Sequence, residues 1–232
     1  MNSKWIPVTS ADGGQFDAYV SYPPTGHGPG LIIIQEIFGV NEHIRAVADQ
    51  YAADGFLAIA PDIFWRDAKR IELKYDAEGF KQGLDLMGGL NIPLVAGDLR
   101  STVEAVKRLD ACTGRVGSVG FCMGGMLSFV AAARAGVDTA VCYYGGGIDK
   151  QLDLAKAIRC PILLHFAEQD SYIPSASVKQ ITRALAGHPA ARIITHPGVD
   201  HGFNCWRRPA WNQNTAARAR GQTLVHLAES LG

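Results

Sequence analysis

Cys122 is the side chain whose setting in the sequence points most directly to chemistry. It stands in Gly120-Phe121-Cys122-Met123-Gly124, between an apolar run over residues 115–119 and a segment of helical spacing. Gly-x-nucleophile-x-Gly between a strand and a helix is the pattern of a nucleophile elbow, a sharp turn that exposes its central side chain. The glycines leave room for neighbouring backbone, and a helix N-terminus favours a thiolate. The pattern therefore predicts a cysteine nucleophile at this turn.

A carboxylate and a histidine follow the elbow, each in a loop after a further apolar run. The acid is Glu168 or Asp170, and the histidine is His196 or His201. Nucleophile, acid and histidine in this order are typical of α/β-hydrolase triads, in which the acid holds the histidine in one tautomer. We favour Asp170, which stands farther from its strand, and His201, which lies in a glycine-flanked loop beyond its strand. Glu168 and His196 are the alternatives.

These residues need a sheet that brings the ends of several strands to one edge. Six short, continuously apolar runs predict strands buried on both faces, and they alternate with five segments of helical spacing. The strand runs cover 30–34, 56–60, 115–119, 140–144, 161–166 and 192–195, and the helical segments cover 42–54, 95–109, 123–135, 175–186 and 211–231. The alternation predicts an α/β fold with a mostly parallel, doubly wound sheet, whose ligands bind at the carboxyl ends of the strands.

The N-terminal segment has a different pattern. Residues 5–22 contain two short strand-like runs around Asp12-Gly13-Gly14, which predicts an antiparallel hairpin at an edge of the sheet. The chain of 232 residues shows no internal repeat and no low-complexity linker, so we expect a single domain over 1–232.

Composition narrows the classes of partner. The 22 basic and 22 acidic side chains balance, so no nucleic-acid partner is expected. No apolar stretch is long enough to predict a membrane span, and the first residues lack the core of a signal peptide, so we expect a cytoplasmic protein. The five cysteines are odd in number and include no Cys-x-x-Cys pair, which argues against a disulfide framework and a structural zinc site. We expect no cofactor and no metal.

Several motifs together resemble the dienelactone hydrolases, also called carboxymethylenebutenolidases, over nearly the whole chain. They are Gln35-Glu36-Ile37-Phe38-Gly39-Val40-Asn41, Ala60-Pro61-Asp62, the elbow with Gly125, Tyr143-Tyr144-Gly145 and Asp200-His201-Gly202-Phe203. The resemblance implies an α/β-hydrolase fold, a monomer, and a triad that falls on Cys122, His201 and Asp170. It implies an enzyme of aromatic-compound degradation that opens a lactone, or cleaves a carboxylic ester, through an acyl-enzyme.

The resemblance also implies roles for residues near the triad. The glutamate that matches Glu36 interacts with the resting thiol and takes its proton when substrate binds. The oxyanion hole should consist of two backbone N–H groups. One belongs to Met123, directly after the nucleophile, and the other to Ile37 in the loop after an earlier strand.

The residues that should bind substrate depart from the family pattern. Family substrates carry a carboxylate that arginines bind, but the position shortly after the histidine holds Cys205, and arginine first appears at Arg207. The second arginine is expected within 70–81, where the only cationic residues after Arg70 are lysines. Lysine cannot form a planar bidentate contact with a carboxylate.

Because these arginines are missing, more than one class of ester or lactone fits the sequence. We expect Phe38, Tyr144, Trp206 and Arg207 to contact a small-molecule ester or lactone, with residues 87–93 near the rim of the pocket. A neutral or bulkier ester or lactone is the alternative substrate. A non-catalytic binding module on the same fold is the alternative function, because fold does not fix function.

Overall fold

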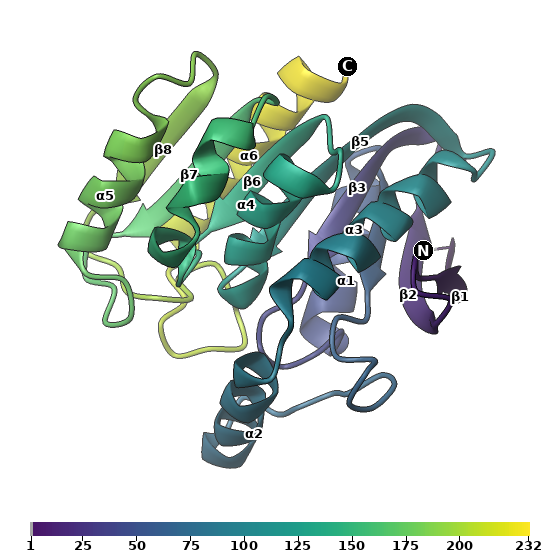
Figure 1. The fold of residues 1–232 in the computed structure, drawn as a ribbon, viewed down its shortest axis with the longest axis horizontal. Coiled ribbons are helices and arrows are strands. Elements are labelled where there is room, and N and C mark those ends of the chain that lie inside the picture. The colour runs from purple at the N-terminus through teal and green to yellow at the C-terminus, as the bar shows by residue number, and fades with distance from the viewer. Residues whose placement is uncertain (1) are drawn as a thin grey trace.

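An eight-stranded sheet crosses the molecule, with helices on both of its faces (Figure 1). The computed structural model describes residues 2–232. The strands are β1 (Asn2–Thr9), β2 (Gln15–Tyr22), β3 (Gly28–Ile34), β4 (Leu57–Pro61), β5 (Cys112–Phe121), β6 (Thr139–Tyr143), β7 (Ile162–Ala167) and β8 (Ala191–His196). Their order is β1-β2-β4-β3-β5-β6-β7-β8. The pairs from β4 through β8 are parallel, whereas β1 and β2 pair antiparallel at one edge.

Six α-helices connect and cover these strands. They are α1 (Glu42–Ala53), α2 (Ala77–Gly88), α3 (Ile92–Lys107), α4 (Met123–Arg134), α5 (Ser175–Leu185) and α6 (Gln213–Leu231), with 3₁₀ turns at Ile148–Lys150 and Leu152–Ala157. Helices α3, α4 and α5 lie in front of the sheet in Figure 1, α1 and α6 lie behind it, and α2 projects below its edge. Among residues 2–232, no helix is both long enough and apolar enough to cross a membrane.

Local chemistry sets where the helices begin. Asn41, Asp76, Asn91 and Asn212 are the N-cap residues of α1, α2, α3 and α6, and each side chain accepts a hydrogen bond from a backbone N–H of the first turn. Such a cap satisfies one of the N–H groups that a helix start leaves without an intrahelical partner. Helix α4 differs because its N-cap is Cys122, whose side chain makes no capping hydrogen bond.

The predicted α/β-hydrolase architecture is confirmed. All residues of β4, β6 and β7 are buried, as expected of parallel strands covered on both faces. The predicted N-terminal hairpin is present, and its two strands pair from Asn2 with Tyr22 to Thr9 with Gln15.

Helix α2 is the element that the apolar pattern did not predict. Its buried residues are only Gly79 and Gly83, so it carries no continuous apolar stripe against the core. The N-cap Asp76, with Glu78 in the first turn, was the available signal for its start. Helix α2 lies beside a cavity at the edge of the sheet, and its apolar side chains line that cavity.

Candidate active site

Cys122 stands at the sharp turn between β5 and α4. Its backbone φ of 55° lies in the left-handed region, which is strained for a residue with a side chain. A Cβ at Gly120 would lie 1.8 Å from the carbonyl oxygen of Gly124, and a Cβ at Gly124 would lie 2.2 Å from that of Ile34. Both positions therefore require glycine, and the predicted strand–elbow–helix geometry is present.

His201 and Asp170 form a buried pair beside the elbow. Asp170 follows β7 and His201 follows β8, and Asp170 Oδ2 lies 2.9 Å from His201 Nδ1. Asp170 Oδ1 accepts hydrogen bonds from the N–H groups of Tyr172 and Ile173, at 2.9 and 3.0 Å. These bonds fix the carboxylate, which in turn assigns the Nδ1 proton of His201 and leaves Nε2 for the nucleophile.

The protonation of His201 responds to both of its neighbours. Burial of the ring opposes the charged form, but the hydrogen bonds with Asp170 and Cys122 outweigh burial and raise the pKa of His201 to about 10. The raised pKa favours a protonated ring, which can donate a proton from Nε2. Cys122 itself stands at the N-terminus of α4, where the helix dipole stabilises negative charge on the sulfur.

The two alternative residues lie outside this arrangement. Glu168 accepts a hydrogen bond from the N–H of Gly198 at 2.9 Å, at the protein surface. His196 is hydrogen bonded to His165, with 3.0 Å between His165 Nδ1 and His196 Nε2. The structure thus brings Asp170 and His201 to Cys122, and keeps Glu168 and His196 in other contacts.

Two backbone N–H groups are available beside the sulfur. Ile37 and Met123 both line the cavity that contains Cys122. Within residues 2–232, neither N–H meets a hydrogen-bond acceptor, and Met123 is the first residue of α4, where no intrahelical partner exists. Unpaired donors at a helix N-terminus are suited to hold a developing negative charge.

Glu36 is buried close to the triad but has other partners. Arg208 Nη1 donates to its Oε1 at 3.3 Å, and the hydroxyl of Tyr75 donates to its Oε2 at 3.1 Å. Among the described residues, no hydrogen bond joins Glu36 to Cys122. Arg208 itself lines the cavity and is close enough to Cys122 for their charges to interact. Arg208 therefore lies between the carboxylate and the substrate side of the site.

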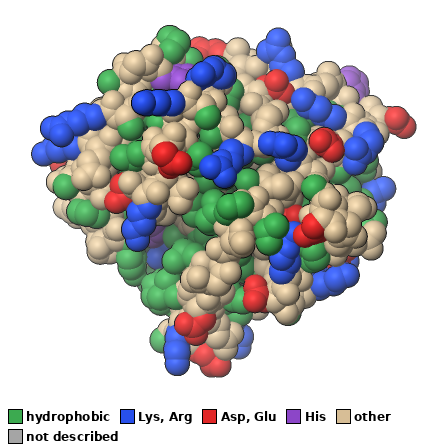
Figure 2. Space-filling model, viewed as in Figure 1, with side chains coloured by type: hydrophobic (Ala, Val, Ile, Leu, Met, Phe, Trp, Pro, Cys, Tyr) green, Lys and Arg blue, Asp and Glu red, His purple; other side chains and the backbone are tan. Residues whose placement is uncertain are grey.

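The cavity above Cys122 has a volume of about 470 Å³, which falls in the range of small-molecule sites. Phe80, Leu84 and Met87 of α2 form one wall, and Figure 2 shows hydrophobic side chains gathered just above the tip of this helix. The rest of the lining includes Ile37, Phe38, Met126, Tyr172 and the two cationic side chains Lys150 and Arg208. A mostly apolar cavity with few charges suits a small, largely hydrophobic ligand.

Phe38 and Tyr144 were both predicted to contact substrate, but only Phe38 lines the cavity. Tyr144, with φ 36°, is fully buried and packs its ring 5.0 Å from that of His201, so it supports the histidine from behind.

Trp206 and Arg207 depart from the expectation because neither lines the cavity. The chain turns twice after His201, since Cys205 N–H donates to Gly202 and Arg208 N–H donates to Cys205. These turns place Trp206 against the ring of His43 and Arg207 in an ion pair with Glu42, and they direct Arg208 inward.

Lys150 and Arg208 are the cavity cations that sequence reasoning missed. Lys150 follows β6 in a 3₁₀ turn, far in sequence from the motifs. Arg208 adjoins Arg207, and a loop has no periodicity to tell which of two neighbouring side chains points inward.

Comparison with known proteins gives one consistent result. The family model described as "Dienelactone hydrolase family" matches residues 16–231. A carboxymethylenebutenolidase of Cupriavidus pinatubonensis is 32% identical over 98% of this chain and 97% of its own length. A protein of Azospirillum brasilense, provisionally named a carboxymethylenebutenolidase, is 34% identical over 98% of this chain and 99% of its own. Among solved structures, a provisionally named dienelactone hydrolase of Klebsiella pneumoniae has a TM-score of 0.85 at 27% identity, covering 98% and 99% of the two chains.

Proposed function

The chain belongs to the dienelactone hydrolase family of ester and lactone hydrolases, and from its site we propose that it acts through a Cys122–His201–Asp170 triad and a thioester acyl-enzyme. The observation that carries the proposal is the hydrogen-bonded His201–Asp170 pair next to a cysteine at a strained elbow. The two unpaired N–H groups of Ile37 and Met123 supply the oxyanion hole.

The chemistry follows from these positions. The Cys122 sulfur attacks the carbonyl carbon, and the N–H groups of Ile37 and Met123 stabilise the resulting oxyanion. Collapse of the tetrahedral intermediate breaks the carbon–oxygen bond, and the leaving oxygen takes the proton from Nε2 of His201. Water then attacks the thioester while Nε2 accepts its proton, and the thiolate is the leaving group. Asp170 keeps the imidazole in one tautomer through both steps.

We propose that Glu36 controls the thiol, as the resemblance implies, with Arg208 as the switch. In the structure Arg208 holds the Glu36 carboxylate. A change in the partner of Arg208, such as an incoming anionic substrate group, frees Glu36 to take the thiol proton. A Glu36→Gln variant should then show a slower acylation step while its acyl-enzyme still hydrolyses at the normal rate.

The substrate we propose is a small, mostly apolar ester or lactone, with Lys150 and Arg208 available for an anionic group. A panel of lactones and aryl esters, each with and without a carboxylate, tests this choice. Replacement of Arg208 by Met should raise KM for the carboxylate-bearing members only. Equal effects on neutral and anionic members would show that Arg208 acts only through Glu36 and does not bind the substrate carboxylate.

Trapping of the acyl-enzyme is the direct test of the nucleophile. A His201→Gln variant incubated with an activated aryl ester should accumulate a thioester, because deacylation needs the imidazole. Peptide mass spectrometry should find the acyl group on the peptide that contains Cys122, and Cys122→Ala protein should carry none. Acyl groups on another residue, or none at all while product forms in a burst, would refute the covalent mechanism.

A further inference from the structure

A second cluster of reactive side chains lies outside the substrate cavity, joined to it through Glu36. One carboxylate oxygen of Glu36, one ring nitrogen of His43 and the sulfur of Cys205 all lie within 4.8 Å of one another. The exposed fractions of the three residues are 1%, 4% and 0%. They come from the loop after β3, the first turn of α1 and the loop after β8, so the fold and not the local sequence assembles them.

The imidazole of His43 has a buried polar atom that no partner explains. Its Nδ1 is buried and has no hydrogen-bond partner among residues 2–232. Leaving such an atom unpaired costs about 1–3 kcal/mol. A neutral imidazole has one ring nitrogen whose lone pair can bind a metal ion. The ring is held in place by Trp206, with 4.0 Å between the ring centroids.

We propose that Glu36, His43 and Cys205 form a site for a divalent transition-metal ion, with Zn²⁺ as the best match. A carboxylate oxygen, an imidazole nitrogen and a thiolate sulfur are the donor types that zinc takes in proteins. Calcium and magnesium are poor matches because they select oxygen ligands. The donors must approach by roughly 1 Å to reach tetrahedral zinc geometry, which small side-chain rotations supply.

The charges at this site balance when the ion binds. The Cys205 thiol must lose its proton to bind the ion as a thiolate. Binding releases that proton to solvent, and the sulfur forms the metal bond in its place. The thiolate and the Glu36 carboxylate then neutralise the two charges of the ion, and water takes the remaining coordination position.

A surface depression reaches His43, one of the three proposed ligands, without opening into the substrate cavity. It has a volume of about 410 Å³ and is lined by His43, Tyr75 and Glu42 among others, and neither Cys122 nor His201 borders it. Bound metal would compete with Arg208 for the Glu36 carboxylate. The metal site would therefore act on the cavity, because Arg208 released from Glu36 is a cation at the substrate wall.

Metal binding can be tested without relying on catalysis. In Cys122→Ala protein, which removes the catalytic thiol as a competing ligand, Co²⁺ should bind once per chain with a thiolate-to-cobalt charge-transfer band in the near ultraviolet. Zn²⁺ should displace it, and calorimetry should give the same stoichiometry. Adding Cys205→Ser should abolish the band and weaken Zn²⁺ binding at least about 10-fold, the lower end of what even an outer-shell change costs.

Matched variants separate this site from adventitious binding. Adding Cys160→Ala to the Cys122→Ala background should leave the band and the affinity unchanged, because Cys160 lies elsewhere. Adding His43→Phe should weaken binding without removing the thiolate, and it carries the test if the Cys205 variant fails to fold by circular dichroism. Absence of a stoichiometric Co²⁺ band in Cys122→Ala protein, or its survival in folded Cys205→Ser protein, would overturn the proposal. Neither result would bear on the hydrolase mechanism.

Discussion

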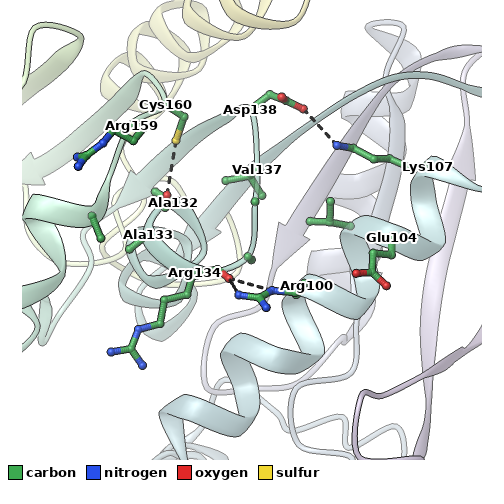
Figure 3. A pocket seen from close by; sticks show the side chains of 14 residues that line it. Arg100, Glu104, Lys107, Ala132, Ala133, Arg134, Val137, Asp138, Arg159 and Cys160 are labelled. Carbon is green, nitrogen blue, oxygen red and sulfur yellow. Dashed lines mark hydrogen bonds and ion pairs between the residues drawn. The ribbon is translucent and has the colours of Figure 1, made fainter.

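A cysteine lies beside a cavity or depression at each end of helix α4, but the chemical surroundings of the two thiols differ. Cys122 precedes the first turn of the helix and lines a mostly apolar cavity of about 470 Å³. Cys160 lies at the other end, where its sulfur donates to the carbonyl of Ala132 at 3.9 Å (Figure 3). The depression around Cys160 is larger, at about 760 Å³. The size of a hollow therefore does not identify the active site.

The chemical surroundings explain which cysteine can react. Burial, with a contribution from the charge of Asp138, raises the pKa of Cys160 to about 11, and the carbonyl end of a helix disfavours negative charge. The lining there combines cationic, acidic and small apolar side chains, and Arg100 donates to the carbonyl of Arg134, as Figure 3 shows. Cys122 instead has a helix N-terminus, and the side chain of His201, which is hydrogen bonded to Asp170, lies beside it. Helix polarity and a neighbouring base together favour Cys122 as the proposed nucleophile.

The largest predicted difference between the two ends is in turnover. Cys122→Ala should lower kcat on an activated aryl ester by roughly 10⁴-fold or more, because removing a nucleophile disables the whole triad. Cys160→Ala and Cys112→Ala should keep nearly full activity. Steady-state assays on the three purified variants make the comparison, and an active Cys122→Ala protein would end the case for this nucleophile.

The carboxylates at the two ends provide the next comparison. Asp170→Asn should lower kcat by about 10³- to 10⁴-fold, because an amide no longer stabilises the imidazolium or fixes its tautomer. Asp138 is the matched control. Its Oδ2 accepts from the N–H of Val116 at 2.8 Å and lies near Lys107, but it contacts no reacting group. Asp138→Asn should change stability slightly and kcat little, and similar losses in both variants would show that Asp170 is structural.

The elbow at the start of α4 could be predicted because its signals are local. The glycines around Cys122 mark the elbow by spacing alone, since any side chain at Gly120 or Gly124 would meet backbone. Chain order then selected an acid and a histidine, and the buried strand pattern gave the sheet that brings them together. Asp170 could be favoured over Glu168, although only the 2.9 Å contact with His201 distinguishes them.

Features that depend on how separate loops meet could not be predicted. Arg207 and Arg208 are neighbours in sequence, and two successive turns decide that Arg208 faces the cavity. Helix α2 lacks a buried stripe because its apolar residues face an open cavity. The cluster of Glu36, His43 and Cys205 draws on three segments, whereas a zinc site is recognised in sequence by closely spaced ligands.

Thiol alkylation sharpens the comparison without any substrate. Cys122 should react with iodoacetamide about 100-fold faster than Cys160 at neutral pH. The thiolate is the reacting form, a helix N-terminus favours it at Cys122, and burial disfavours it at Cys160. The rate at Cys160 should rise about tenfold per pH unit until its pKa of about 11 is approached. Mass spectrometry of the two peptides over time measures both rates. Equal rates at neutral pH would remove the proposed electrostatic difference.

The smallest predicted contrast concerns the glycines at the two ends of α4. Gly120→Ala places a Cβ 1.8 Å from the carbonyl oxygen of Gly124, so backbone must move, and we expect a loss of about 3 kcal/mol in the free energy of unfolding. Gly136, just past the other end, has φ +75° and open space around its Cβ position. Gly136→Ala should lower the free energy of unfolding only by the strain of the left-handed backbone conformation, about 1–2 kcal/mol.

Urea denaturation of the two glycine variants measures this contrast, and activity of the folded fraction adds a second reading. Gly120→Ala should lose activity beyond its loss of folded protein, because any backbone shift moves Cys122 relative to His201. Gly136→Ala should retain the specific activity of its folded fraction. If Gly120→Ala were as active per folded molecule as the parent, the strained backbone of Cys122 would be a feature of folding alone, and the tight elbow would not be needed for catalysis.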